Sequence, residues 1–73
     1  MSKRYVKEFI NDWIASYQGT TAVIAAAAIE YGNKVLRYYT RGLITSFEAV
    51  KMVSSTDAWE LAHGCGDRFN GGI

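Results

Sequence analysis

Three reactive side chains stand close together near the carboxyl end of the sequence, at His63, Cys65 and Asp67. A thiol and an imidazole can act as nucleophile and base, but the base must be held within hydrogen-bonding distance of the thiol. Here the three residues alternate with glycines, so nothing local holds them in place. A structural zinc site needs four ligands, whereas the 73-residue chain has one cysteine and one histidine. We therefore expect no catalytic residue, no metal site, no cofactor and no enzymatic activity.

A second group that could do chemistry is the basic strip formed by Lys34, Arg37 and Arg41. Three phosphate contacts would give only weak, salt-sensitive binding to nucleic acid. A DNA-recognition helix also carries base-reading donors near its N-terminal end, but the helix that should follow begins at Ser46 with mostly apolar residues. Because the net charge is only +1 as well, we do not expect a nucleic-acid partner. A DNA-binding transcriptional regulator remains an alternative function.

The basic strip belongs to the segment from Thr20 to Gly42, which is predicted to form one helix around which the others are arranged. At 100° per residue, apolar and small residues cover an arc of about 200°, roughly twice that of an ordinary surface helix. This helix therefore needs partners on two adjacent faces. The residues of the arc are Ala27, Tyr38, Tyr31, Ile24, Val35, Ala28, Tyr39, Gly32, Ala25, Leu36 and Ile29.

Two small residues at the centre of this arc, Ala28 and Gly32, indicate that another backbone approaches closely. A glycine inside a helix costs about 1 kcal/mol relative to alanine, so a packing reason for Gly32 is expected. We predict that a second copy crosses at Gly32 and forms a homodimer, with Ala25, Ala28, Ile29 and Gly32 as the self-association residues. The alternatives are helices of the same chain or a foreign partner.

A helix is predicted from Lys3 to Gln18, capped by Ser2 and ended by Gly19 in the left-handed conformation. Its apolar residues recur at spacings of three and one, which confines them to one stripe. We expect Trp13, near the centre of the stripe, to be a core residue. The stripe consists of Val6, Phe9, Ile10, Trp13, Ile14 and Tyr17.

A third helix should begin at Ser46, because Thr45 and Glu48 have capping-box spacing and Gly42 can end the helix before it. Its face bearing Phe47 and Val50 is expected to pack on the central helix. The segment 36–53, with its turn at residues 41–45, resembles the hairpin of short oligomerisation domains at the C-termini of many bacterial proteins. Residues 46–48 depart from that family's acidic-acidic-aromatic order, so we interpret the resemblance as a shared turn and not as membership.

The remainder of the chain allows two interpretations. Residues 54–57 either continue the third helix poorly or break it, and in the second case Asp57 caps a short fourth helix that ends at His63. From residue 64 the sequence is rich in glycine and has no periodicity. We therefore divide the chain into a helical domain at 1–63 and a flexible tail at 64–73.

Composition places the chain among all-α proteins, as a small bundle of three to four helices with a central alanine-rich helix and a glycine-rich C-terminal tail. The sequence is 49% hydrophobic, contains no proline and shows no strand pattern. A single cysteine excludes an internal disulfide and is typical of a reducing cytoplasm. The apolar run at 22–29 falls short of the ~20 residues that span a membrane. We expect a cytoplasmic protein without a membrane partner.

Aromatic residues make up 14% of the sequence, and tyrosine, tryptophan and arginine are the types that anchor protein interfaces. We therefore predict a non-catalytic protein-protein interaction module. Its small size is typical of phage or mobile-element inhibitors of a host enzyme or defence complex, and a structural homo-oligomerisation module is a further alternative. The predicted partner-binding residues are Tyr31, Arg37, Tyr38, Arg41, Met52 and Trp59.

Overall fold

The computed structural model of the protein describes residues 2–63. Four helices follow one another, and no strand occurs in this range, which confirms the predicted all-α bundle. The predicted tail, and with it Cys65 and Asp67, lies outside the described residues. The helices are α1 (Lys3–Ala15), α2 (Ala22–Thr40), α3 (Ser46–Ser54) and α4 (Ala58–Ala62).

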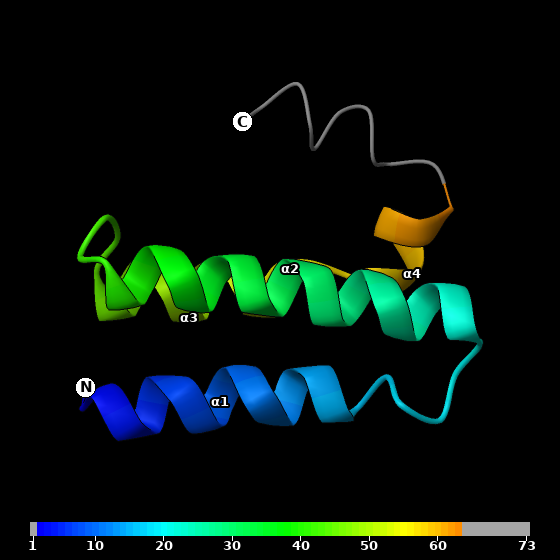
Figure 1. Ribbon diagram of the computed structural model, residues 1–73, viewed down its shortest axis with the longest axis horizontal. Coiled ribbons are helices and arrows are strands. Elements are labelled where there is room, and N and C mark those ends of the chain that lie inside the picture. Colours follow the sequence, from blue (N-terminus) through cyan, green and yellow to red (C-terminus); the bar gives the residue numbers. More distant parts are fainter. Residues whose placement is uncertain (1, 64–73) are drawn as a thin grey trace.

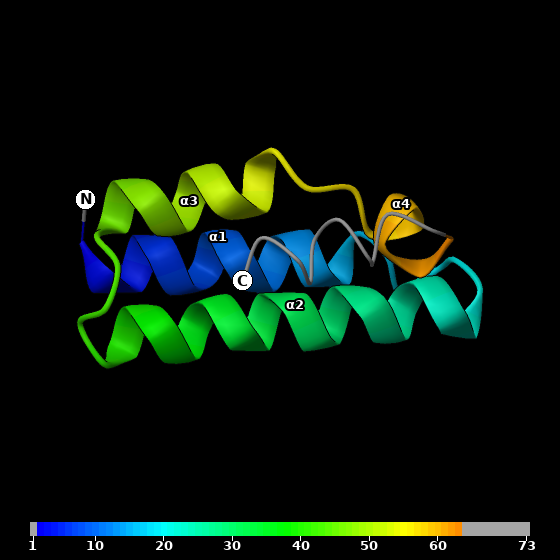
Figure 2. The same ribbon diagram turned by 90° about the horizontal axis from the view of Figure 1, so that it is seen from above.

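Helix α2 is the centre of the bundle, because it contacts each of the other three helices. It runs antiparallel to α1 and to α3, so that the N-terminal ends of α1 and α3 lie beside its C-terminal end (Figures 1 and 2). Helix α4 packs near the opposite end of α2 (Figure 1). The wide apolar arc predicted for this helix is thus shared among three neighbours of the same chain.

Helix α1 begins where the sequence predicts but ends earlier. The Ser2 side chain accepts a hydrogen bond from the Tyr5 backbone N–H at 3.1 Å, as a helix cap does. The helix ends at Ala15, because the backbone N–H groups of Tyr17 and Gln18 donate to carbonyls three residues back, as in a 3₁₀ turn. The prediction that Gly19 ends this helix in the left-handed conformation is therefore wrong, since among the described glycines only Gly42 has a positive φ.

The predicted hairpin between α2 and α3 is confirmed in its hydrogen bonds. Gly42 has φ 78°, its N–H donates to the Tyr39 carbonyl at 3.0 Å, and the Leu43 N–H donates to the Tyr38 carbonyl at 2.9 Å. This pair of bonds is the Schellman motif, which satisfies the last carbonyls of a helix. Beyond the turn, Thr45 and Glu48 form the predicted capping box, with bonds of 2.8 and 3.1 Å.

The core-facing side of α3 differs from the prediction. Ala49 and Val53, which are one turn apart, are fully buried, whereas the Phe47 side chain is 66% exposed. Phe47 precedes Ala49 by two residues and is therefore rotated by about 200° around the helix, away from the core. Val50 keeps part of its predicted role, because it is half-buried and packs against the core.

The ambiguous segment at 54–57 is a break. Helix α3 ends at Ser54. Beyond it, the hydroxyl of Thr56 donates a hydrogen bond to the Met52 carbonyl at 2.6 Å, so a side chain satisfies one of the carbonyls at the end of the helix. Asp57 then caps α4, accepting a hydrogen bond from the Trp59 N–H at 2.9 Å. The short fourth helix is thus present, one of the two alternatives that the sequence left open.

Two groups of buried residues form the core. The larger one joins the first three helices and consists of Val6, Ile10, Tyr31, Val35, Ala49 and Val53. The smaller one joins α2 to α4 and consists of Ile24, Ala28 and Ala58. Trp13 is half-buried and packs against both groups. It therefore bridges the two parts of the core instead of being enclosed by one of them.

A close approach to Gly32 exists, but it comes from the same chain. A Cβ atom at Gly32 would lie 2.5 Å from Cδ1 and 2.6 Å from Cγ1 of Ile14, so α1 already fills the space where a side chain would stand. Ala28 is fully buried beside Ala58 of α4. The predicted crossing of a second copy at Ala28 and Gly32 does not fit this packing. Ala25 is half-buried and Ile29 is exposed.

Candidate interaction surface

Three exposed apolar side chains belong to the elements that meet at the end of the bundle where the α2–α3 hairpin lies beside the start of α1. Leu43 and Phe47 are each 66% exposed, and Tyr5 is 49% exposed. The hairpin and the first turns of α1 and α3 share this end of the molecule (Figures 1 and 2). We name Tyr5, Leu43 and Phe47 the hairpin-end surface. Phe47 points away from the core because the Thr45 cap fixes the phase of α3, whereas Leu43 lies in the turn between Gly42 and Thr45 and Tyr5 in the first turn of α1.

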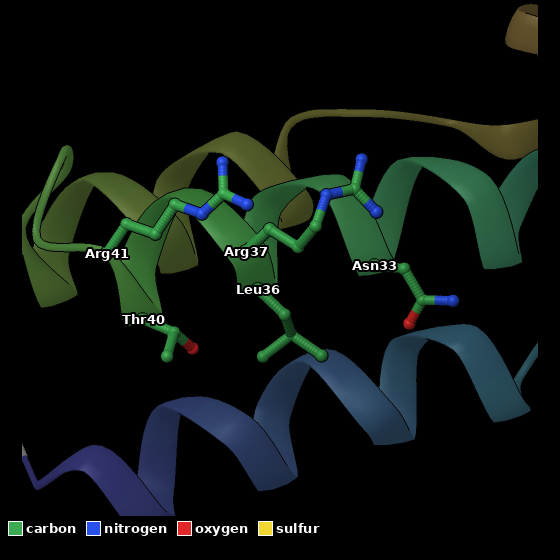
Figure 3. A pocket seen from close by; sticks show the side chains of 5 residues that line it. All are labelled: Asn33, Leu36, Arg37, Thr40 and Arg41. Carbon is green, nitrogen blue, oxygen red and sulfur yellow. The ribbon is translucent and has the colours of Figure 1, made fainter.

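An open, shallow hollow runs along the C-terminal half of α2, and we name it the arginine face. Its residues are spaced by three and one along the helix and therefore share one side of it. Figure 3 shows the two guanidinium groups one after the other along the helix, while Leu36 and Thr40 point toward α1. The hollow is lined by Asn33, Leu36, Arg37, Thr40 and Arg41.

The arginine face carries two positive charges that are not neutralised nearby. Arg37 and Arg41 are exposed, and neither forms an ion pair or a side-chain hydrogen bond with any residue of the range 2–63. The carboxylate of Glu48 accepts the Thr45 backbone N–H within the capping box. Both arginines stand at the end of α2, where a cation is stabilised by the helix dipole by about 0.3–1 kcal/mol. They therefore have a structural role, and their guanidinium groups are also accessible to a ligand.

One of the predicted partner-binding residues belongs instead to the core, and a second packs against it. Tyr31 is buried, and its hydroxyl donates to the Met52 carbonyl at 3.3 Å and lies 3.2 Å from the Thr56 hydroxyl. Met52 is half-buried and packs against the larger core group. Tyr31 is thus corrected to a core residue, because the apolar arc of α2 turns it toward α3.

The remaining predicted residues do not form one surface. Lys34 Nζ lies 5.9 Å from the ring centroid of the half-buried Tyr38, a cation–π contact on α2. Trp59 is exposed, but it belongs to α4 at the other end of the bundle, where its ring centroid lies 4.5 Å from that of His63. Only Arg37 and Arg41 stand together, close to the hairpin-end surface.

Sequence reasoning missed the exposed residues of the hairpin-end surface. It expected the face of the third helix that bears Phe47 and Val50 to pack on the central helix. The capping box contained the missing signal. It fixes Thr45 as the cap, and Ala49 and Val53, which are one turn apart in the helix that follows, form the apolar pair that is buried. No comparable local signal marks Leu43.

Residues 2–63 contain no group of three or more histidine, cysteine, aspartate or glutamate side chains that could hold a metal ion. None of the described helices has the length and apolar character needed to cross a bilayer. No family model, curated protein or solved structure matches this chain.

Proposed function

We propose that this protein is a small protein-binding module whose interface is the hairpin-end surface. The observation that supports the proposal is the exposure of Leu43 and Phe47, two large apolar side chains that stand before and after the Thr45 cap. Isolated apolar residues are common on protein surfaces, but a cluster of them is typical of interaction sites. Full burial of one such side chain contributes about 1.5–3 kcal/mol of favourable free energy, so covering both side chains would stabilise a complex with a partner substantially.

The turn between α2 and α3 also makes this surface suitable for binding. The Schellman motif and the capping box hold the backbone on both sides of Leu43. A surface that is already ordered loses less conformational entropy on binding than a flexible loop does. The finer hypothesis, that the protein is a phage or mobile-element inhibitor of a host enzyme or defence complex in the cytoplasm, has the small size and single cysteine of the chain in its favour.

A capture experiment with matched variants tests the proposal. The protein is immobilised and exposed to lysate of the source cells, in parallel with a Leu43→Ser/Phe47→Ser variant and a Val23→Ser control. Val23 is equally apolar and 60% exposed, but it stands in the first turn of α2 at the opposite end of the bundle. Because all three side chains are exposed, the variants should melt within a few degrees of the parent protein.

We expect one stoichiometric protein to be retained by the parent and by Val23→Ser, and to be lost with the double variant. Equal retention by the double variant would show that the interface lies elsewhere. Recovery of nucleic acid would favour the DNA-binding regulator. Self-association without any other partner would favour the homo-oligomerisation module, and the mass of the isolated protein by light scattering detects that outcome directly.

A further inference from the structure

We propose that the arginine face is the second part of the same interface and that it binds an acidic helix of the partner protein, one with two carboxylates a turn apart beside an apolar side chain. This inference rests on the proposed function, because it specifies the chemistry of the protein that the hairpin-end surface binds. Three features of the structure lead to it: the spacing of the two arginines, the composition of the hollow and its adjacency in the sequence to the hairpin-end surface.

The spacing of the arginines selects a helical ligand. Arg37 and Arg41 are four residues apart on one side of α2, which separates their backbones by about 6 Å along the helix axis. Carboxylates at positions i and i+4 of a second helix are separated by the same rise. A guanidinium group also matches a carboxylate with two parallel hydrogen bonds, which a lysine ammonium cannot do. Each arginine can therefore pair with one acidic side chain of a helix that lies along α2.

The composition of the hollow adds an apolar contact to the charged ones. Leu36 lines the hollow together with the two arginines, but it is half-buried, packs against the larger core group and points toward α1, away from the guanidinium groups (Figure 3). Thr40 and Asn33, also in the lining, offer a hydroxyl and an amide that can bond the backbone or a polar side chain of the ligand. An amphipathic acidic helix complements this mixture, whereas a nucleic-acid backbone would leave Leu36 without a matching apolar group.

The arginine face and the hairpin-end surface are adjacent in the sequence. Arg41 is the C-cap of α2, and Leu43 follows it by two residues across the Gly42 turn. A partner that covers Leu43 and Phe47 is thereby brought to the end of the arginine face. Apolar contacts at the centre and charged contacts at the edge are the usual arrangement of a protein interface.

The test uses a synthetic helical peptide with glutamates at positions i and i+4 beside a leucine, and a second peptide in which glutamine replaces both glutamates. Binding to the full chain is measured by amide chemical shifts at low and physiological salt. We expect the glutamate peptide to shift the amides of residues 33–41 and to bind about ten-fold more tightly than the glutamine peptide. The difference should shrink as salt is added, because exposed charges are screened.

Variants of the chain complete the test. Arg37→Gln/Arg41→Gln should remove the preference for glutamate, whereas Lys51→Gln, an exposed cation on α3, should keep it. Equal binding of the two peptides, no binding of either, or an unchanged preference in the arginine variant would overturn the inference. Tighter binding of a DNA duplex than of the glutamate peptide, lost in the same variant, would also overturn it.

The two proposals fail separately. If Leu43→Ser/Phe47→Ser loses the captured protein while the peptides show no preference, the hairpin-end surface stands and the acidic ligand does not. If the peptides behave as expected but the hairpin-end variant keeps its partner, the proposed interface is wrong although the arginine face binds carboxylates.

Discussion

The substitution Gly32→Ala tests the central packing contact of the bundle. The added Cβ would stand 2.5 Å from Cδ1 and 2.6 Å from Cγ1 of Ile14, distances at which carbon atoms repel strongly. Either the Ile14 side chain must therefore change its rotamer or α1 must shift away from α2. Forcing an extra methyl group into a packed core costs about 1–3 kcal/mol. Replacing glycine by alanine inside a helix also stabilises the helix by about 1 kcal/mol, which opposes this cost.

The net effect of Gly32→Ala should be a destabilisation of about 0–2 kcal/mol. For a domain of this size, 1 kcal/mol corresponds to roughly 4–8 °C in the melting temperature, so thermal unfolding followed by circular dichroism can resolve it. Gly19→Ala is the matched control. No atom lies within 4 Å of a Cβ placed there and its φ is not positive, so this change should stabilise the protein by about 0.4–1 kcal/mol.

A double-mutant cycle with Ile14→Ala separates the contact from the helix propensity. In the Ile14→Ala background the space beside Gly32 is open, so adding the Cβ should be more favourable than in the parent by about 1 kcal/mol or more. If Gly32→Ala instead raised the melting temperature as much as Gly19→Ala does, with no coupling to Ile14, then α1 would not approach α2 this closely. The glycine would need another explanation, such as the second copy predicted from the sequence.

Two further substitutions test the turn and the bridge between the core groups. Gly42→Ala should destabilise the protein by about 1–2 kcal/mol in chemical denaturation, because φ 78° is unfavourable for a residue with a Cβ; an unchanged midpoint would contradict the left-handed turn. Trp13→Ala should cost about 2–3 kcal/mol, less than the ~3–5 of an enclosed tryptophan, because Trp13 is only half-buried. A loss of less than about 1 kcal/mol would show that Trp13 does not join the two core groups.

Local signals in the sequence determined the elements of the fold. The caps at Ser2 and Thr45 and the glycine at Gly42 were predictable because a cap depends on hydrogen bonds between residues two to five positions apart. The stripe of α1 was predictable for the same reason, since its period follows from the geometry of a single helix. The exception was the end of α1, where 3₁₀-type bonds after Ala15 replaced the expected glycine cap.

The tertiary structure decided which neighbour covers each part of the apolar arc of α2. The sequence showed that Gly32 needed a close neighbour, but α1, a foreign protein and a second copy all satisfy that need locally. Only the placement of Ile14 against Gly32 selects α1. The same holds for the candidate surface: the orientation of Phe47 depends on how Ala49 and Val53 meet the other helices. Such contacts join residues far apart in the chain, and no short segment of sequence contains them.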